Sequence, residues 1–133
     1  MWPNPSFFEG KKRDQLSNIS ITRIDWSASL FIDSIRFTMS NGDSSPKFGS
    51  RAFNAFCQLD FPISKIRLSV KDRRLVGINL YSANEEEPFL KIHGTEMVQN
   101  SADVILDTQE SLIGFNVRVD KSQVQGIGFK ILS

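Results

Sequence analysis

Along most of the chain, apolar and polar residues alternate with a period of two. This spacing is typical of β-strands with one buried face, whereas a helix repeats its apolar positions every three to four residues. Turn sequences such as Asn41-Gly42-Asp43 and Lys71-Asp72 separate the alternating segments. The pattern therefore predicts an all-β fold. Examples of the alternation are Ile19-x-Ile21, Ile35-x-Phe37-x-Met39, Ile66-x-Leu68-x-Val70 and Val104-x-Leu106.

One short motif occurs three times: an apolar residue, two further residues, isoleucine, one residue and a second apolar residue. In the second and third copies an upstream apolar residue lies twelve positions before the central isoleucine, and in the first copy it lies eleven positions before. The spacing predicts three strand-rich units of roughly forty residues that pack their apolar faces inward. The copies are Ile32-x-x-Ile35-x-Phe37, Leu75-x-x-Ile78-x-Leu80 and Val124-x-x-Ile127-x-Phe129.

The aromatic residues add to the expected core. Six phenylalanines have two interpretations, the lining of a ligand groove or the core. We favour the core, because large apolar side chains in a β domain are mostly buried. Trp26 lies in Asp25-Trp26-Ser27, which we interpret as a turn region, and we expect its ring to be half-buried against the sheet. The phenylalanines concerned are Phe7, Phe8, Phe31, Phe53, Phe56 and Phe61.

Length, hydrophobic content and charge narrow the classes of function. A chain of 133 residues with 40% hydrophobic residues is sufficient for one core, so we expect a single domain over residues 1–133. Sixteen Lys and Arg residues against fifteen Asp and Glu residues give a net charge of +1. This balance produces no global field that would attract nucleic acid, so we expect no nucleic-acid partner.

Cys57 is the only cysteine and His93 the only histidine. One thiol cannot form a disulfide within the chain, and two such ligands cannot hold zinc, so we expect no metal and no cofactor. No apolar run reaches the roughly 18 residues of a membrane span, and the N-terminus lacks the pattern of a secretory signal. These features predict a cytoplasmic protein. Because no catalytic motif is present, we predict no enzyme activity and no catalytic residues.

Several segments, taken in their order along the chain, resemble the jacalin-related lectin family. The resemblance extends from about Phe7 to Leu132. It implies a β-prism of three four-stranded Greek-key sheets with pseudo-threefold symmetry, and a carbohydrate-binding module that needs no metal. The matching segments are Phe7-Phe8-Glu9-Gly10, Ile32 to Phe37 followed by Asn41-Gly42 and Gly49, Leu75 to Leu80, and Leu112 to Phe115 followed by Val124 to Phe129.

The resemblance also implies where a sugar would bind. The family holds sugar at one end of the prism, through a final-unit loop that reads glycine, three residues, aspartate. In this chain Lys121 occupies the glycine position and Gln125 the aspartate position. The Gln125 amide can both donate and accept, and Asp120 can supply a substitute carboxylate. The candidate carbohydrate-binding residues of this loop are Asp120, Lys121, Ser122, Gln123 and Gln125.

The corresponding loop of the middle unit is Lys71-Asp72-Arg73-Arg74. We add Asp72, Arg73 and Arg74 to the candidate carbohydrate-binding residues. The two guanidinium groups favour acidic or phosphorylated partners over neutral mannose. The alternative interpretation is that both loops are polar hairpin tips whose charges keep the strand ends soluble.

Two functions remain open from the sequence. The first is a lectin-like module that binds a glycan of the mannose, glucose or galactose type. The second is a protein-interaction or assembly module that kept the prism and lost the sugar site. Lys121 and Gln125 favour the second function, while the unbroken resemblance in fold favours the first. In both cases a homo-oligomer is possible.

Overall fold

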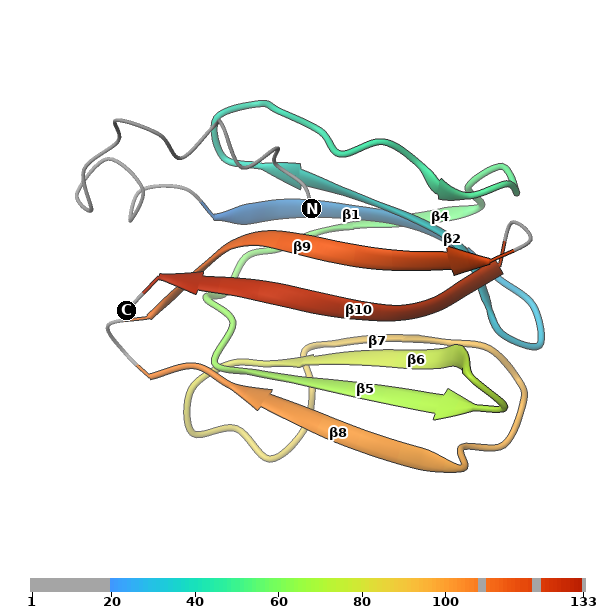
Figure 1. The fold of residues 1–133 in the computed structure, drawn as a ribbon. Helices are drawn as coiled ribbons and strands as arrows, with labels where there is room; N and C mark the ends of the chain where they lie inside the picture. Colours follow the sequence, from blue (N-terminus) through green and yellow to red (C-terminus); the bar gives the residue numbers. More distant parts are fainter. Residues whose placement is uncertain (1–19, 108–109, 121–122, 133) are drawn as a thin grey trace.

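The computed structural model describes residues 20–107, 110–120 and 123–132. These residues form ten strands in antiparallel pairs and contain no helix, and so none that could cross a membrane (Figure 1). The all-β prediction is confirmed. The strands are β1 (Ile21–Ala28), β2 (Ile32–Met39), β3 (Phe48–Gly49), β4 (Ala55–Gln58), β5 (Lys65–Lys71), β6 (Arg74–Tyr81), β7 (Leu90–His93), β8 (Asn100–Ile105), β9 (Ser111–Asp120) and β10 (Gln123–Leu132).

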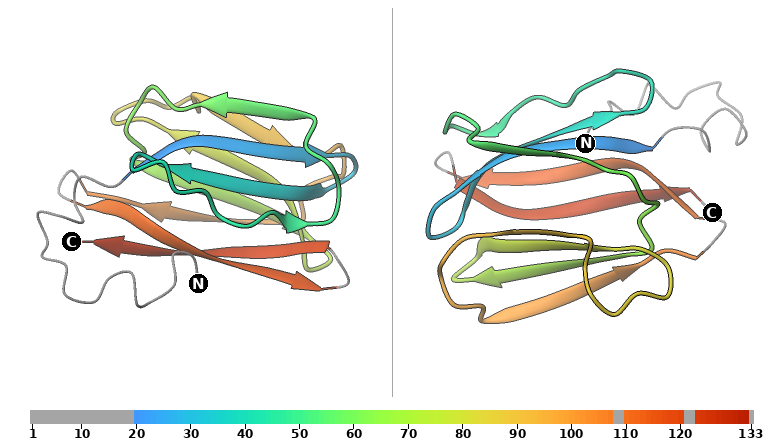
Figure 2. Two further views of the ribbon diagram at one scale, coloured as in Figure 1. Left: turned by 90° about the horizontal axis from the view of Figure 1, so that it is seen from above. Right: turned by 180° about the vertical axis from the view of Figure 1, so that it is seen from behind.

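The strands form three sheets around one interior, with orders β3-β2-β1-β4, β7-β6-β5-β8 and β10-β9 (Figures 1 and 2). In both four-stranded sheets the third strand lies beside the second and the fourth returns beside the first, which is a Greek key. The third sheet has two strands within the described residues. The N-terminal segment Phe7-Phe8-Glu9-Gly10 lies outside them.

Each central hairpin contains a β-bulge at the same point of the repeated motif. One residue of the second strand has no partner across the ladder, so the pairing shifts there by one position. Without this extra residue, apolar positions three apart would face opposite sides of the sheet. The bulge therefore explains why the motif reads apolar, two residues, isoleucine. The three bulged residues are Asp33, Val76 and Gln125.

The central isoleucines lie where the repeat predicts. Ile35 is 0% exposed, Ile78 is 2% exposed, and Ile127 is partly buried against the same core. The hairpins also contact one another directly, because the rings of Phe37 and Phe115 stack with centroids 4.2 Å apart. One apolar interior is thus shared by all three sheets. It lies under equivalent cross-strand pairs in the three hairpins, namely Ile24 with Phe37, Ile66 with Leu80, and Phe115 with Phe129.

Some aromatic predictions were wrong. Trp26 is not in a turn but inside β1, where it pairs with Ile35, while its expected half-burial is confirmed. Phe56 and Phe61 are 60% and 56% exposed. The Phe56 ring instead lies on the outer face of its sheet, where the Arg23 guanidinium stacks 4.2 Å from its centroid. A cation can cover an aromatic face and so take the place of burial in the core.

Replacing Ile78 by alanine should destabilise the protein by about 2–5 kcal/mol, because the lost side chain leaves a cavity in a packed interior. Chemical denaturation followed by circular dichroism measures this change. The matched control is Ile105→Ala, since Ile105 is 67% exposed and its loss should cost less than about 1 kcal/mol. Equal losses for the two variants would contradict the inward orientation of the repeat.

Candidate functional site

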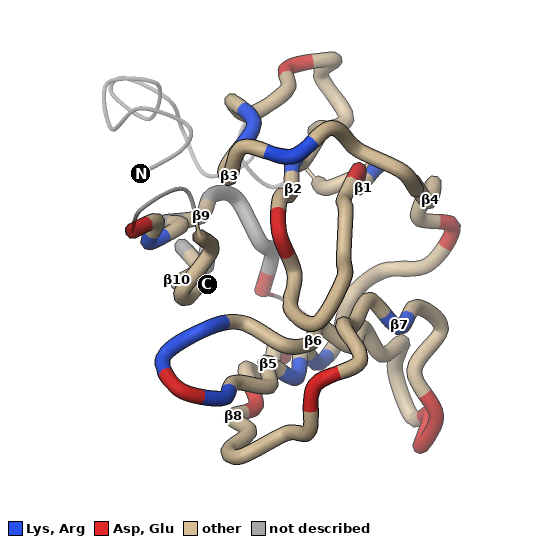
Figure 3. Tube along the Cα trace, turned by 90° about the vertical axis from the view of Figure 1, so that its right-hand side faces the viewer, with Lys and Arg blue, Asp and Glu red and all other residues tan. Residues whose placement is uncertain are grey.

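The tips of all three central hairpins lie at one end of the molecule, which we call the hairpin-tip end (Figures 1 and 3). It comprises the loop of residues 29–31, the turn Lys71 to Arg74, and the ends of β9 and β10 at Asp120 and Gln123. The two loops predicted to carry sugar-binding residues are therefore at the same end. The bulges lie just behind these tips, so they set how the tip residues are presented.

The loop of residues 94–99 connects the first two hairpin tips. Its backbone donates from Thr95 N to Ser29 O (2.9 Å), from Gly94 N to Val76 O (2.8 Å), and from Gln99 N to Val70 O (3.0 Å). A Cβ on Gly94 would lie 2.1 Å from the Leu30 carbonyl oxygen, so only glycine allows this approach. Backbone hydrogen bonds between segments far apart in the sequence thus fix the shape of this surface.

The turn between β5 and β6 has an uncommon backbone. Asp72 and Arg73 have φ values of 51° and 63°, both in the left-handed region. Two such residues between a closing pair are typical of a type I′ turn, whose second position favours glycine. An arginine at this position, with a left-handed backbone, lowers the stability of the fold by roughly 1–2 kcal/mol. The Arg73 side chain is exposed, and no hydrogen bond or ion pair holds it within the described part of the chain.

The neighbouring turn residues are held in place. The Asp72 amide donates to Gln99 Oε1 (3.1 Å), and the Lys71 ammonium forms an ion pair with Glu96. The hydrogen bond with Lys71 lowers the pKa of the Glu96 carboxyl, and the same bond raises the pKa of Lys71. These contacts fix the turn against the loop of residues 94–99.

Arg74 serves mainly as a link between the first two units. Its guanidinium lies 3.9 Å from the Phe31 ring centroid, and Nη2 lies 3.9 Å from Asp33 Oδ1. Asp33, the bulged residue of the first unit, also accepts from Arg51 at 3.4 Å. Among the described residues, no hydrogen-bond acceptor faces the buried Nε atom of Arg74. Of the two predicted arginines, Arg73 is the one whose charge is free to meet a partner.

Asp120 and Gln125 lie together on the exposed end of the third hairpin. Gln125 Nε2 donates to Asp120 Oδ2 at 3.4 Å, and Gln123 pairs with Asp120 across the ladder. A carboxylate and an amide side by side offer acceptors and a donor within the span of two neighbouring hydroxyls. The structure thus brings together three of the five residues predicted for this loop. Lys121 and Ser122 lie outside the described residues.

Exposed apolar side chains at this end were not predicted as site residues. Leu30, Met97 and Val98 are 56%, 78% and 53% exposed. They are neighbours, because Glu96 N donates to Leu30 O at 2.9 Å and Met97 and Val98 follow directly. We call these three residues the tip patch. Its only sequence signal is the presence of large apolar residues in segments with turn character.

The described residues contain no group of three or more His, Cys, Asp or Glu side chains that could hold a metal ion. His93 lies at the end of the edge strand β7, is exposed, and has Nδ1 3.2 Å from the Gly94 carbonyl oxygen. Within the described ranges, no hydrogen bond or ion pair joins the His93 ring to an acid or a nucleophile. The hairpin-tip end therefore offers hydrogen bonds, one free guanidinium and apolar contact, which are means of binding.

No known family model and no curated protein sequence matches the chain. Solved structures do match its fold. The lamprey immune protein superposes with a TM-score of 0.68 at 14% identity, over 86% of this chain and 37% of that one. PirB superposes with a TM-score of 0.63 at 9% identity, over 86% of this chain and 29% of that one. Calystegia sepium agglutinin superposes with a TM-score of 0.58 at 14% identity, over 85% of this chain and 82% of that one.

The chain thus spans about a third of the length of the first two proteins and most of the agglutinin. At these identities the likeness concerns the fold alone. It supports the β-prism architecture that the family resemblance implied, and it concerns no particular residue at the hairpin tips.

Replacing Arg73 by glycine should stabilise the protein by about 0.5–1 kcal/mol, because glycine adopts the left-handed backbone without strain. The unfolding midpoint in urea measures the gain. Arg73→Ala is the control, since alanine removes the guanidinium but keeps the unfavourable backbone, and its stability should stay near that of the wild type. A gain for alanine equal to that for glycine would assign the effect to charge instead of backbone.

The Glu96 carboxyl should titrate below its ordinary value of 4.5, because the hydrogen bond from Lys71 favours its charged form. Because the pKa of Glu96 is lower in the folded state than in the unfolded state, the ion pair stabilises the fold at pH values above the ordinary pKa. This stabilisation is lost as the pH falls through the lowered pKa of the folded state. NMR titration of the Glu96 side chain measures the midpoint. In Lys71→Met the midpoint should rise toward 4.5, and no change in that variant would contradict the ion pair.

Proposed function

We propose that this chain is a glycan-binding module that binds saccharides at the hairpin-tip end, without catalysis. The observation that carries the proposal is the hydrogen-bonded pair of Asp120, which is exposed, and Gln125, which is partly exposed, on the third hairpin. Their oxygens accept from hydroxyl groups and the Gln125 amide donates to them. Adjacent hydroxyls of a pyranose ring require this combination. The pair replaces the single aspartate of the lectin pattern with a two-residue equivalent.

Other features of the hairpin-tip end suit a sugar. The tip patch provides exposed apolar surface for the C–H face of a ring, while Arg73 provides a free guanidinium for a carboxylate or sulfate on a neighbouring unit. The lectin-like fold supports the same conclusion, since one structure with this fold, covering most of this chain, is named an agglutinin. We therefore expect the glycan to span the third and second hairpin tips.

Binding of single sugars should be weak, near the millimolar range of about −4 kcal/mol. Titration with mannose, glucose and galactose should therefore shift NMR amide signals of residues 117–120 and 123–125 for at least one sugar. Asp120→Ala and Gln125→Ala should each weaken that binding by about 1–3 kcal/mol, because a partner group is left without its hydrogen bond.

Matched controls are Asp60→Ala and Gln58→Ala, which remove the same side chains from exposed positions at and after the end of β4. Both controls should bind sugar like the wild type. Shifts with none of the three sugars, together with an unchanged fold, would contradict the proposal.

The tip patch favours a second candidate function, binding of a protein partner. Exposed apolar side chains that gather in one place and have polar residues around them are typical of interaction surfaces. The loop that carries Met97 and Val98 is joined to the turn of Arg73 by the hydrogen bond from Asp72 N to Gln99 Oε1. The probe for this function is Arg73→Glu, which reverses the charge at an exposed site. Arg74 is unsuitable because its replacement removes the stack on Phe31. Loss of a captured partner on Arg73→Glu, with no sugar binding in the wild type, would favour this candidate.

A further inference from the structure

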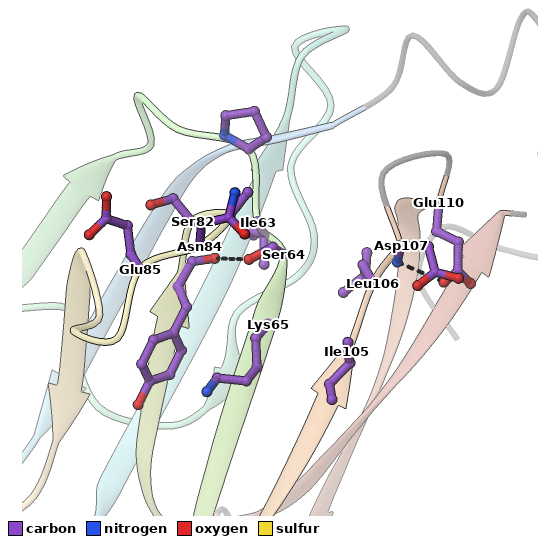
Figure 4. Close-up of a pocket in the computed structure, with 13 residues that line it drawn as sticks. Ile63, Ser64, Lys65, Ser82, Asn84, Glu85, Ile105, Leu106, Asp107 and Glu110 are labelled. Atoms are coloured by element: carbon purple, nitrogen blue, oxygen red, sulfur yellow. Dashed lines mark hydrogen bonds between the residues drawn. The ribbon is translucent and has the colours of Figure 1, made fainter.

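A second candidate site lies at the end of the molecule opposite the hairpin tips. There the structure forms an open hollow of about 1020 Å³, at the upper end of the roughly 300–1,000 Å³ typical of ligand pockets. One wall comes from the start of β5, the end of β6 and the loop after it. The other comes from Ile105 at the end of β8 and from Leu106, Asp107 and Glu110 (Figure 4).

Several polar side chains of this hollow point to solvent without a partner among the residues that the structure describes. In the described residues, the side chains of Ser82, Asn84, Glu85 and Asp107 make no hydrogen bond or ion pair, and they line the hollow from both walls (Figure 4). A hydroxyl, an amide and two carboxylates together offer donors and many acceptors. Such a mixed set matches a ligand that carries several hydroxyl groups.

The same hollow also has an apolar strip. Ile63, Ile105 and Leu106 line it, and the Ile105 side chain is 67% exposed. An apolar strip beside free polar groups fits a ligand with both kinds of surface. Sugar rings have this character, since their hydroxyls project at the edge and their C–H groups form an apolar face.

The charge of the lining selects among saccharides. The lining contains three carboxylates, those of Glu85, Asp107 and Glu110, and one ammonium, that of Lys65. Lys65 is already engaged, because its Nζ lies 4.1 Å from the Tyr81 ring centroid. The net negative charge disfavours uronic acids and sulfated sugars. It permits neutral sugars and favours sugars that carry an amino group.

We infer that this hollow binds a short oligosaccharide made of neutral or amino sugars. The inference is independent of the hairpin-tip site, since the two sites lie at opposite ends and share no residue. Each can therefore fail without the other.

The test is an NMR titration of the full chain with defined trisaccharides. The probes are neutral trisaccharides of glucose, mannose and galactose, a glucosamine trimer and a galacturonic acid trimer, each up to about 10 mM. We expect the glucosamine trimer and at least one neutral trisaccharide to shift amides of residues 82–85 and 105–107. The galacturonic acid trimer should leave these residues unchanged.

Two variants connect the shifts to the hollow. Asp107→Asn and Glu85→Gln should each weaken binding about three- to tenfold, as expected for loss of a charged hydrogen-bond acceptor. The matched control is Glu87→Gln, because Glu87 is exposed in the same loop as Glu85 but does not line the hollow. It should bind like the wild type.

Three results would overturn the inference. The first is the absence of shifts in residues 82–85 and 105–107 with every probe, whatever happens at residues 117–120. The second is equal weakening by the control variant Glu87→Gln. The third is binding of a lysine-rich peptide at this hollow with no response to any saccharide, which would assign the hollow to basic peptides.

Discussion

The fold depends on one extra residue in the second strand of each central hairpin. In a regular strand, residues three positions apart face opposite sides, so Leu75 and Ile78 could not both reach the interior. The bulge corrects this, and both side chains are buried. Because the same correction occurs in all three hairpins, their apolar faces meet at one core. A missing bulge would expose half of the apolar set of its hairpin.

The three bulged residues occupy equivalent backbone positions, but their side chains differ in chemistry and in surroundings. The Asp33 carboxylate forms ion pairs with Arg51 and Arg74, and the pair with Arg74 connects the first unit to the second. Val76 is buried at 1% exposure. Gln125 alone remains at the surface with a polar side chain that meets another candidate residue, Asp120. The pseudo-threefold repeat thus offers three equivalent positions, and only the third hairpin keeps a surface position available for a ligand.

The sequence predicted those parts of the fold that depend on period and repetition. The motif of Ile35, Ile78 and Ile127 was sufficient to place three buried faces, because burial follows spacing along each strand. Greek-key order in the first two sheets was expected from the resemblance to a known family and is confirmed by the strand order.

Other features depend on contacts between segments far apart in the sequence, which spacing does not encode. Arg74 looked as free as Arg73, yet it stacks on Phe31 from another unit. The strained backbone of Arg73 was also hidden, since arginine gives no signal for a left-handed residue. Phe56 was expected in the core, but the stack of Arg23 on its ring allows it to remain outside. The hollow near Asp107 joins loops that no motif connects.

The central claim is that the bulge places both the core and the candidate site, and Gln125 tests it because it belongs to both. Deleting Gln125 should cost about 2 kcal/mol or more in the free energy of unfolding, since Val124, now 0% exposed, would turn outward. Deleting Glu86, in an exposed loop, is the matched control and should change stability little. Equal stability of the two deletion variants in urea denaturation would contradict the claim.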